Sequence, residues 1–418
     1  MRARHPHPSA FMFLITPFGA ISGYLTVSIA YLLAKNHVTV EQVAGLVALS
    51  FIPHTWKFLW APIVDTTLRR RVWYLIGAVA TALGIALTSM LPLSARALPL
   101  LSVVVVVSNF GVTLLGMATE SLMAYGVPES EKGRAGGWFQ AGNLGGAGLG
   151  GGAGLWLAQH LKAAWMSGAA LGAVCLLCAL ALPLVQEPAV VHRESTLGRS
   201  LRAVVLDIVR VARSRLGFLA LALCFLPIGS GAAAGLWSAV ADDWGASANT
   251  VALVTGAIAG LVSAAGCIVG GWICDRMDRK IAYLLYGIAQ AACAAGMALA
   301  PHNQFDYILF TTIYAFITGL TYAGFTAFVL EAMGLGAAAT KFSLYASLSN
   351  FPIMYMTTVD GSAHTRWGPS GMLYAEAVIG MVGLVAFLIV TEVVRRTGSH
   401  VFTASPSLAV ADPPASPD

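Results

Sequence analysis

Long apolar runs separated by short polar segments dominate this chain over most of its length. A membrane hydrocarbon core of about 30 Å needs roughly 20 helical residues to cross it. Only helices and closed barrels satisfy their backbone hydrogen bonds in lipid, and runs of this length favour helices. The pattern therefore predicts an all-α membrane protein with twelve transmembrane helices, at residues 11–34, 41–64, 72–92, 97–125, 134–159, 166–185, 216–240, 250–274, 281–300, 306–331, 341–361 and 370–394.

Composition supports lipid as the solvent and narrows the range of functions. The chain is 57% hydrophobic and 10% charged, whereas a soluble domain carries roughly 25% charged residues. The sequence contains no nucleophile constellation, metal-ligand cluster or nucleotide motif, so we expect no enzyme activity, no metal and no cofactor. The formal net charge of +5 does not indicate nucleic acid, because the cations lie at the ends of the apolar runs, where they orient membrane proteins.

The distribution of Lys and Arg predicts which side of the membrane each loop faces. With both termini inside, nineteen of the 24 cations fall in cytoplasmic segments and four in outer loops, and Lys57 lies within a span. This bias follows the positive-inside rule, so we expect both termini to be cytoplasmic.

Polar segments divide the chain into two halves. The longest of them, residues 186–215, is basic and predicts a cytoplasmic linker between a six-helix bundle at 1–185 and a second bundle at 216–396. Its later part, Leu197–Arg215, has apolar residues at helical spacing, which fits either an amphipathic helix on the inner leaflet or a plain solvated linker. Residues 397–418 are rich in Ser, Pro and Ala and predict a disordered tail.

Two short basic turns occur at matching places in these halves. Asp65 ends an apolar run and is followed by Arg69–Arg71, and Asp275 ends another and is followed by Arg276, Arg279 and Lys280. The two acids are 210 residues apart in a chain of 418. The repetition of this acidic and basic turn in both halves suggests an internal duplication.

Further matches support a duplicated six-helix unit. Glu120 and Glu331 end corresponding spans 211 residues apart, and Asn143 and Asn350 are 207 residues apart. Each of these asparagines follows a base by nine residues, namely Arg134 and Lys341. Repeats of this kind are typical of secondary transporters.

The motifs themselves resemble one membrane protein family. GGWICDRMDRK, at Gly270–Lys280, resembles the G-x-x-x-D-R-x-x-R-K turn of the major facilitator superfamily. TWKFLWAPIVD, at Thr55–Asp65, is similar to the K-F-L-W-A-P-L-x-D run of its anhydromuropeptide permease and acetyl-CoA transporter branch. The superfamily resemblance covers residues 11–395, although the first turn lacks the glycine and has Thr66 after its acid. It implies two pseudo-symmetric six-helix bundles around one central site.

This resemblance implies secondary active transport by alternating access. No ATP motif is present, so we expect a proton gradient to drive the import of a small amphiphilic, muropeptide-like solute. A siderophore importer and a drug or metabolite exporter of the same fold are the alternatives. We expect a monomer in the bacterial inner membrane whose partners are the solute, protons and lipid. A membrane enzyme would cluster His, Asp or Cys at one face, and a receptor would need no duplicated turn.

The matching turns provide candidate gating residues. Each acid can accept from backbone N–H groups and pair with a cation across the interface between the halves. We interpret them as latches on the cytoplasmic side, with a fixed loop brace as the alternative. The candidate gating residues are Asp65, Asp275, Arg276, Arg134, Glu331 and Lys341.

Charged groups inside the spans are candidates for proton coupling, because intramembrane charges are costly and usually functional. Glu376 is the best candidate for a carboxylate deep in the bilayer, unless it lies at the outer interface. Glu120 and His54 are further candidates, with a latch and a structural role as their alternatives. Asp360, near the outer end of its span, is a weaker one. Lys57 either attracts an anionic group of the solute into the cavity or extends to the interface.

Polar and aromatic residues inside the spans are candidates for the substrate site. Each of them can instead hold two helices together, a contribution of about 0.6 kcal/mol on average. The glycine-rich stretch Gly142–Gly154 lacks the features of a phosphate loop and predicts close helix contact instead. The candidate substrate-binding residues are Tyr24, Asn109, Gln140, Asn143, Tyr314, Tyr322, Tyr345, Asn350 and Lys57.

Overall fold

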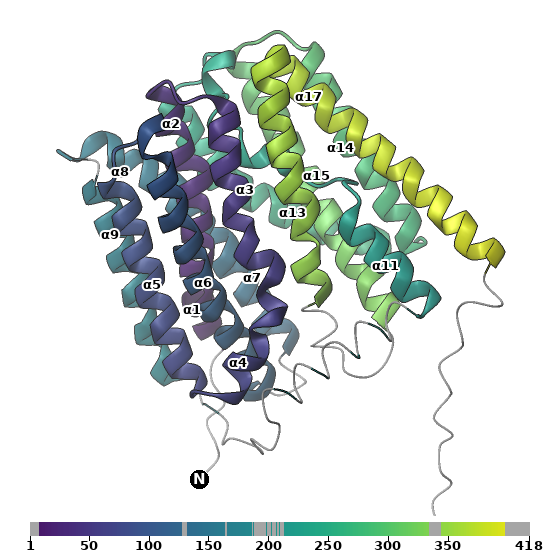
Figure 1. The fold of residues 1–418 in the computed structure, drawn as a ribbon, viewed down its shortest axis with the longest axis horizontal. Coiled ribbons are helices and arrows are strands. Elements are labelled where there is room, and N and C mark those ends of the chain that lie inside the picture. Colours follow the sequence, from purple (N-terminus) through teal and green to yellow (C-terminus); the bar gives the residue numbers. More distant parts are fainter. Residues whose placement is uncertain are drawn as a thin grey trace, which may run out of the picture.

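The computed structural model describes most of the chain as a helical membrane protein (Figure 1). The residues it describes are 8–127, 132–163, 165–185, 187, 198, 202, 206, 209, 213–333 and 344–397. Within them, all regular secondary structure is helical.

The helices of the N-terminal half are frequently interrupted by short π or 3-10 segments. In chain order they are α1 (Ala10–Gly23), η1 (Tyr24–Ile29), α2 (Ala30–Lys35), α3 (Val40–Trp56), η2 (Lys57–Leu59), α4 (Ala61–Thr66), α5 (Arg70–Met90), η3 (Ala95–Ala97), α6 (Leu98–Gly126), α7 (Lys132–Gly148), η5 (Leu149–Ala153), α8 (Gly154–His160), α9 (Trp165–Leu177) and η6 (Cys178–Leu184).

Among the described residues, the C-terminal half contains fewer helices, and the longest ones lie there. They are α11 (Arg215–Phe225), η7 (Ala232–Gly235), η8 (Ala241–Trp244), α12 (Ala248–Val251), η9 (Ala252–Ile258), α13 (Ala259–Cys274), α14 (Arg279–Leu299), α15 (Gln304–Met333) and α17 (Asn350–Thr397). Figure 1 shows the two halves side by side, the first in purple and blue and the second in green and yellow.

The observed helices confirm the predicted all-α membrane fold. Among the described residues, eight helical segments are long and apolar enough to cross a membrane. The predicted spans 41–64, 134–159 and 216–240 are absent from them. The helix of the first changes geometry at Lys57, and that of the third ends at Phe225 instead of continuing to residue 240. The last two predicted spans are joined across a bend at Gly368. Gly368 has φ +72° and precedes Pro369, so the helix turns sharply there. The count of twelve stays a prediction.

Equivalent helix pairs pack in the two halves. The pairs α5–α6 and α5–α9 in the first half correspond to α14–α15 and α14–α17 in the second. The two halves also contain equivalent tyrosine hydrogen bonds, which the sequence analysis did not predict. Tyr74 donates to the Leu14 carbonyl at 3.0 Å, and Tyr283 donates to the Ile228 carbonyl at 2.8 Å. These tyrosines are 209 residues apart, which matches the spacing of the acid turns and supports the duplication.

The glycine-rich stretch makes close helix contacts, as predicted, on two different faces. A side chain at Gly146 or Gly150 would collide with backbone atoms of α1. On another face, the backbone of Gly152 lies directly against Gly256 of η9, in the other half of the protein. Small residues therefore let the backbones approach both within the first half and between the halves.

Candidate functional site

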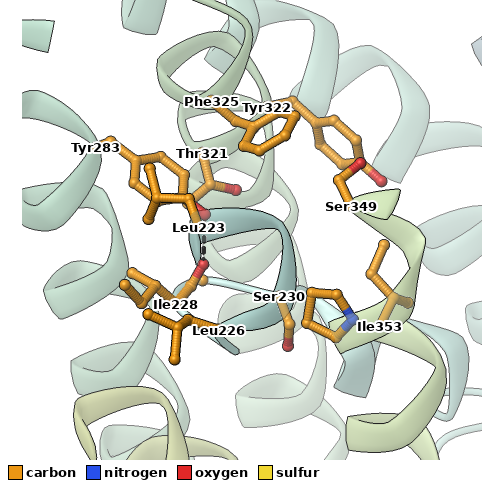
Figure 2. Close-up of a pocket in the computed structure, with 12 residues that line it drawn as sticks. Leu223, Leu226, Ile228, Ser230, Tyr283, Thr321, Tyr322, Phe325, Ser349 and Ile353 are labelled. Atoms are coloured by element: carbon orange, nitrogen blue, oxygen red, sulfur yellow. Dashed lines mark hydrogen bonds between the residues drawn. The ribbon is translucent and has the colours of Figure 1, made fainter. Parts of the chain in front are cut away.

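A break in the first helix of the C-terminal half creates a pocket (Figure 2). Helix α11 ends at Phe225, before Pro227, and both Gly229 and Gly231 have positive φ, at +57° and +70°. Such angles suit glycine because they are strained for other residues. The irregular backbone places Ser230 at the pocket wall.

Leu223, Leu226 and Ile228 of the same segment continue this wall. The remaining walls come from α14, α15 and residues 349–353, and they are formed by Tyr283, Thr321, Tyr322, Phe325, Ser349, Pro352 and Ile353. The lining is mostly apolar, with hydroxyl groups from Ser230, Thr321, Tyr322 and Ser349. Of the predicted substrate residues, Tyr322 lines this pocket.

Glu376, in α17, lies beside the pocket but is buried, with 5% of its surface exposed. Its Oε1 accepts hydrogen bonds from the Tyr314 hydroxyl at 2.7 Å and the Ser230 hydroxyl at 3.3 Å. Tyr314 is held by an edge-to-face contact with Trp237, at 5.1 Å between ring centres. One oxygen of the predicted deep carboxyl therefore accepts hydrogen bonds from two hydroxyl groups.

A second carboxyl lies against the first. Asp360 is completely buried, and its carboxyl interacts with that of Glu376. Asp360 is eight residues before the bend at Gly368, and Glu376 is eight residues after it. At 1.5 Å per residue both acids lie about 12 Å from the bend, at the same depth. The sequence suggested a position for Asp360 near the end of its span, whereas the structure places it well inside.

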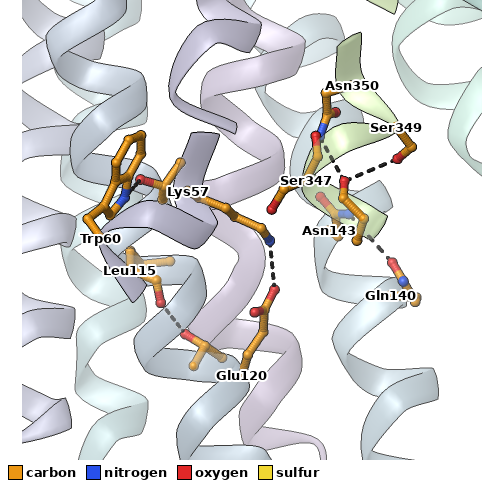
Figure 3. A network of polar contacts seen from close by, with 12 residues as sticks. Lys57, Trp60, Leu115, Glu120, Gln140, Asn143, Ser347, Ser349 and Asn350 are labelled. Atoms are coloured by element: carbon orange, nitrogen blue, oxygen red, sulfur yellow. Dashed lines mark hydrogen bonds and ion pairs between the residues drawn. The ribbon is translucent and has the colours of Figure 1, made fainter. Parts of the chain in front are cut away.

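The N-terminal half contains a separate ion pair, shown in Figure 3. Lys57 Nζ lies 3.5 Å from Glu120 Oε1, where α3 gives way to η2. The Lys57 side chain is 11% exposed and that of Glu120 is 40% exposed. Lys57 thus has an anionic partner within the protein. The alternative role of Glu120, in a latch, stays a prediction, because the side chain of the latch candidate Arg134 lies outside the described residues.

His54 and Asn109 also meet inside the first half. His54 Nε2 lies 3.0 Å from Asn109 Oδ1, and the His54 ring contacts Phe18 edge-to-face. One turn further along, Trp60 donates to the Thr113 hydroxyl at 3.2 Å. These contacts join α3 and its continuation to α6.

Several candidate lining residues hold helices together. The hydroxyls of Tyr24 and Ser167 lie 3.3 Å apart, and Tyr345 donates to the Gly217 carbonyl at 3.2 Å. Both tyrosines are buried. For these two residues the structure favours the helix-packing alternative over substrate contact.

The repeat-related asparagines Asn143 and Asn350 have hydrogen-bond partners in their own segments (Figure 3). Asn143 donates to Gln140 one turn earlier, at 3.5 Å. Asn350 donates to the carbonyls of Ala346 and Ser347, at 2.9 and 3.1 Å. Each amide is thus partly satisfied by its own segment.

The predicted cytoplasmic latches are only partly described. Side chains of Asp65, Arg134 and Glu331, and all of Lys341, lie outside the described residues. Asp275 is exposed at the end of α13. Arg276 stacks on the Trp272 ring at 3.8 Å and donates to the Trp272 carbonyl at 3.0 Å. Because Arg276 binds its own helix, the cross-interface latch stays a prediction.

Polar contacts between the halves, which the sequence did not indicate, occur at the opposite face. We call it the outer face, following the charge bias; it includes α2 and the bend of α17 (Figure 1). Lys35 Nζ lies 2.7 Å from Asp242 Oδ1, and Ser362 donates to Glu41 at 3.1 Å. Beside them, His364 and Asp243 are 2.7 Å apart.

Close backbone contact accompanies these polar pairs. A side chain at Gly361 would collide with Ala44 of α3, in the other half. Deeper in the protein, Val27 and Tyr31 belong to one buried apolar cluster with Trp237 and Tyr314. The two halves are therefore in close contact at the outer face.

Comparisons with known proteins agree with this architecture. The Major Facilitator Superfamily profile matches residues 10–357. The anhydromuropeptide permease of Escherichia coli (strain K12) is 24% identical over 375 residues, which are 86% of this chain and 76% of the permease.

Solved transporters share the fold at low sequence identity. A D-xylose-proton symporter has a TM-score of 0.69 at 15% identity, covering 91% of this chain and 96% of its own. The nucleoside transporter NupG has a TM-score of 0.66 at 11% identity, covering 91% and 98%. Since the profile spans most of the sequence and the helices form the same fold, the chain belongs to the Major Facilitator Superfamily and is a multi-pass membrane transporter.

Proposed function

We propose that this protein is a proton-coupled secondary transporter that carries a muropeptide-like solute across the bacterial inner membrane by alternating access. The observation that carries the proposal is the environment of Glu376. A buried carboxyl whose described partners are hydroxyls and another carboxyl is costly unless it exchanges protons or pairs with a cation.

Glu376 is also well placed for coupling. Ser230 donates to Glu376 and at the same time lines the pocket. A solute in the pocket would therefore lie one side chain away from the carboxyl. Binding that moves Ser230 would change the hydrogen bonding of Glu376, which is a direct physical link between solute and proton.

The proposed substrate class rests on the relative and on the pocket. The similarity to the anhydromuropeptide permease covers most of both chains. Muropeptides combine sugar hydroxyls, amides and carboxyl groups. The pocket, a cavity of about 50 Å³, offers aromatic and aliphatic walls together with the hydroxyls of Ser230, Thr321, Tyr322 and Ser349, a combination that suits contact with one part of an amphiphilic solute.

Alternating access follows from the contacts between the halves. We propose six-helix bundles at 1–185 and 216–396, with the outer face closed by the contacts of Lys35 and Glu41. In the opposite state, the turns at Asp65 and Asp275 would close the cytoplasmic side. The monomer is the proposed transport unit, because pocket, carboxyls and cross-half contacts all lie within one chain.

Flux in proteoliposomes tests this function. We expect a labelled anhydromuropeptide to accumulate when the outside is acidic, and a protonophore to abolish the accumulation. Glu376→Gln should lose gradient-driven accumulation while still equilibrating the label, whereas the surface change Asp306→Asn should behave as wild type.

Each contrary result removes a defined part of the proposal. Accumulation that ignores the pH gradient rules out proton coupling. Accumulation of a ferric siderophore, with none of the muropeptide, overturns the substrate class. Gradient-driven efflux without uptake makes the protein an exporter.

A further inference from the structure

The two buried carboxyls differ in their hydrogen bonding, and this difference distinguishes their roles. We infer that Asp360 carries a proton at neutral pH and that its O–H donates a hydrogen bond to an oxygen of Glu376. This assignment deepens the proton coupling proposed above and rests on it for its role in transport. The two residues form one site for a single proton.

Hydrogen-bond accounting separates the two acids. Glu376 Oε1 receives two donors, the hydroxyls of Tyr314 and Ser230. Donors of this kind stabilise the ionised form of a carboxyl group. Both oxygens of Asp360 are buried and, within the described part of the chain, receive no donor. A buried carboxyl without donors is far more stable in its neutral form.

A proton on Asp360 also resolves two unsatisfied positions at once. Glu376 Oε2 is buried and has no donor among the described residues. The Asp360 carboxyl interacts with the Glu376 carboxyl, so an O–H on Asp360 can donate to Oε2. Two ionised carboxyls in the same buried place would instead repel each other.

A third polar group is directed toward this site. Gln290 is 2% exposed and donates to Thr318 at 3.1 Å, but its Oε1 is buried and unpartnered among the described residues. Its side chain also interacts with the Tyr314 hydroxyl, which donates to Glu376. An acceptor here can take up the Tyr314 hydroxyl when the proton moves.

Transfer of the proton from Asp360 to Glu376 conserves the charge of the pair. When the Asp360 O–H bond breaks and an O–H bond forms on Glu376, one proton moves and the pair keeps its single negative charge. Ser230, between Glu376 and the pocket, then marks the side from which the proton leaves. A second proton delivered to Asp360 would make the pair neutral.

Infrared spectroscopy of the purified full-length protein in lipid nanodiscs tests the assignment without any substrate. The C=O stretch of a buried protonated carboxyl is resolved from that of carboxylates. We expect one such band at neutral pH, lowered in frequency by ¹³C-aspartate and not by ¹³C-glutamate. Asp360→Asn should remove the band. Glu376→Gln and the surface control Asp306→Asn should retain it.

The isotope arm requires no substitution, so a variant that fails to fold does not remove the test. A band that shifts with ¹³C-glutamate, or that persists in Asp360→Asn, overturns the assignment. Loss of the band in both variants overturns it too, because the proton would then belong to the pair. A wild-type protein with no band, stabilised against heat by NaCl but not by choline chloride, would have a metal-cation site instead.

The two proposals fail separately. If the band is assigned to Asp360 but solute flux ignores the pH gradient, the proton site stands and the proton-driven function is wrong. If flux is gradient-driven but the band is absent or belongs to glutamate, coupling stands and the role given to Asp360 is wrong.

Discussion

The contact between Gly152 and Gly256 predicts how strongly the outer face is held closed. An alanine Cβ at Gly256 would lie 2.6 Å from the Gly152 backbone nitrogen and 2.7 Å from its Cα. Backbone atoms cannot move aside as a flexible side chain can, so the two helices must separate. Overpacking of this kind costs about 1–3 kcal/mol, which corresponds to a change of about 5- to 150-fold in the closed-to-open ratio.

The ion pair at the outer face makes a useful comparison. Lys35 and Asp242 have side chains that are 47% and 54% exposed. Exposed pairs contribute about 0.2–1 kcal/mol, so Asp242→Asn should change the same ratio by only about 1.4- to 5-fold. Close backbone packing, more than the ion pair, should therefore keep the outer face closed.

Distances between spin labels on the two halves measure this ratio. In a cysteine-free background, spin labels attached at the exposed positions Asn36 and Phe305 report the separation of the outer ends by double electron–electron resonance. Gly256→Ala should increase the population with the longer distance. The control is Gly271→Ala in α13, where an added Cβ meets no atom within 4 Å. An unchanged distribution in Gly256→Ala, or a larger effect of Asp242→Asn, would refute the reasoning.

Three further predictions concern the scaffold and the latch. Glu120→Gln leaves the nearly buried Lys57 without an anion, so it should lower the free energy of unfolding by about 1–3 kcal/mol. In thermal unfolding, adding Lys57→Met to the same chain should restore part of that loss. If the two substitutions instead lower stability independently and additively, the residues do not act as a pair. Tyr74→Phe and Tyr283→Phe should each lower stability by about 0.5–1.5 kcal/mol, with similar unfolding midpoints if their bonds are equivalent. Asp275→Asn should leave membrane insertion intact but slow transport, and an unchanged uptake rate would refute the latch.

The fold was largely predictable because its signals are local. Apolar runs and acid–base turns can be read directly along the chain, and the 210-residue spacing of Asp65 and Asp275 indicated the duplication. Breaks inside the spans were harder to place. Pro227 was visible, but the pocket depends on the positive φ of Gly229 and Gly231, which only the packed structure determines.

Side-chain partners were much less predictable, because sequence alone does not show which residues meet. Lys57 and Glu120 were both singled out, yet their pairing across 63 residues was not. Lys35 and Asp242 are 207 residues apart and looked like ordinary loop charges. One feature of the sequence could have indicated the Asp360–Glu376 pair. Both acids are eight residues from Gly368, which precedes Pro369, and a helical hairpin that bends there places them at equal depth.

The carboxyl pair of Asp360 and Glu376 occurs in only one of the two duplicated halves. Its position suggests how a change in protonation could affect the contacts at the outer face. The 207-residue spacing of Asn143 and Asn350, which lie in the same predicted spans, relates Asp360 to Ala153, which has no carboxyl group. The carboxyl pair is thus a feature of one half. Yet the residue after Asp360 is Gly361, which touches Ala44 of the other half, and the next is Ser362, which donates to Glu41.

Three consecutive residues therefore join the carboxyl pair to the contact between the halves. A change in charge at Asp360 that shifts the α17 backbone must also shift Gly361, where there is no room for movement toward α3. Closing the outer face and holding the proton at Asp360 then depend on the same turn of helix. This local arrangement can couple a proton to alternating access without a long pathway through the protein.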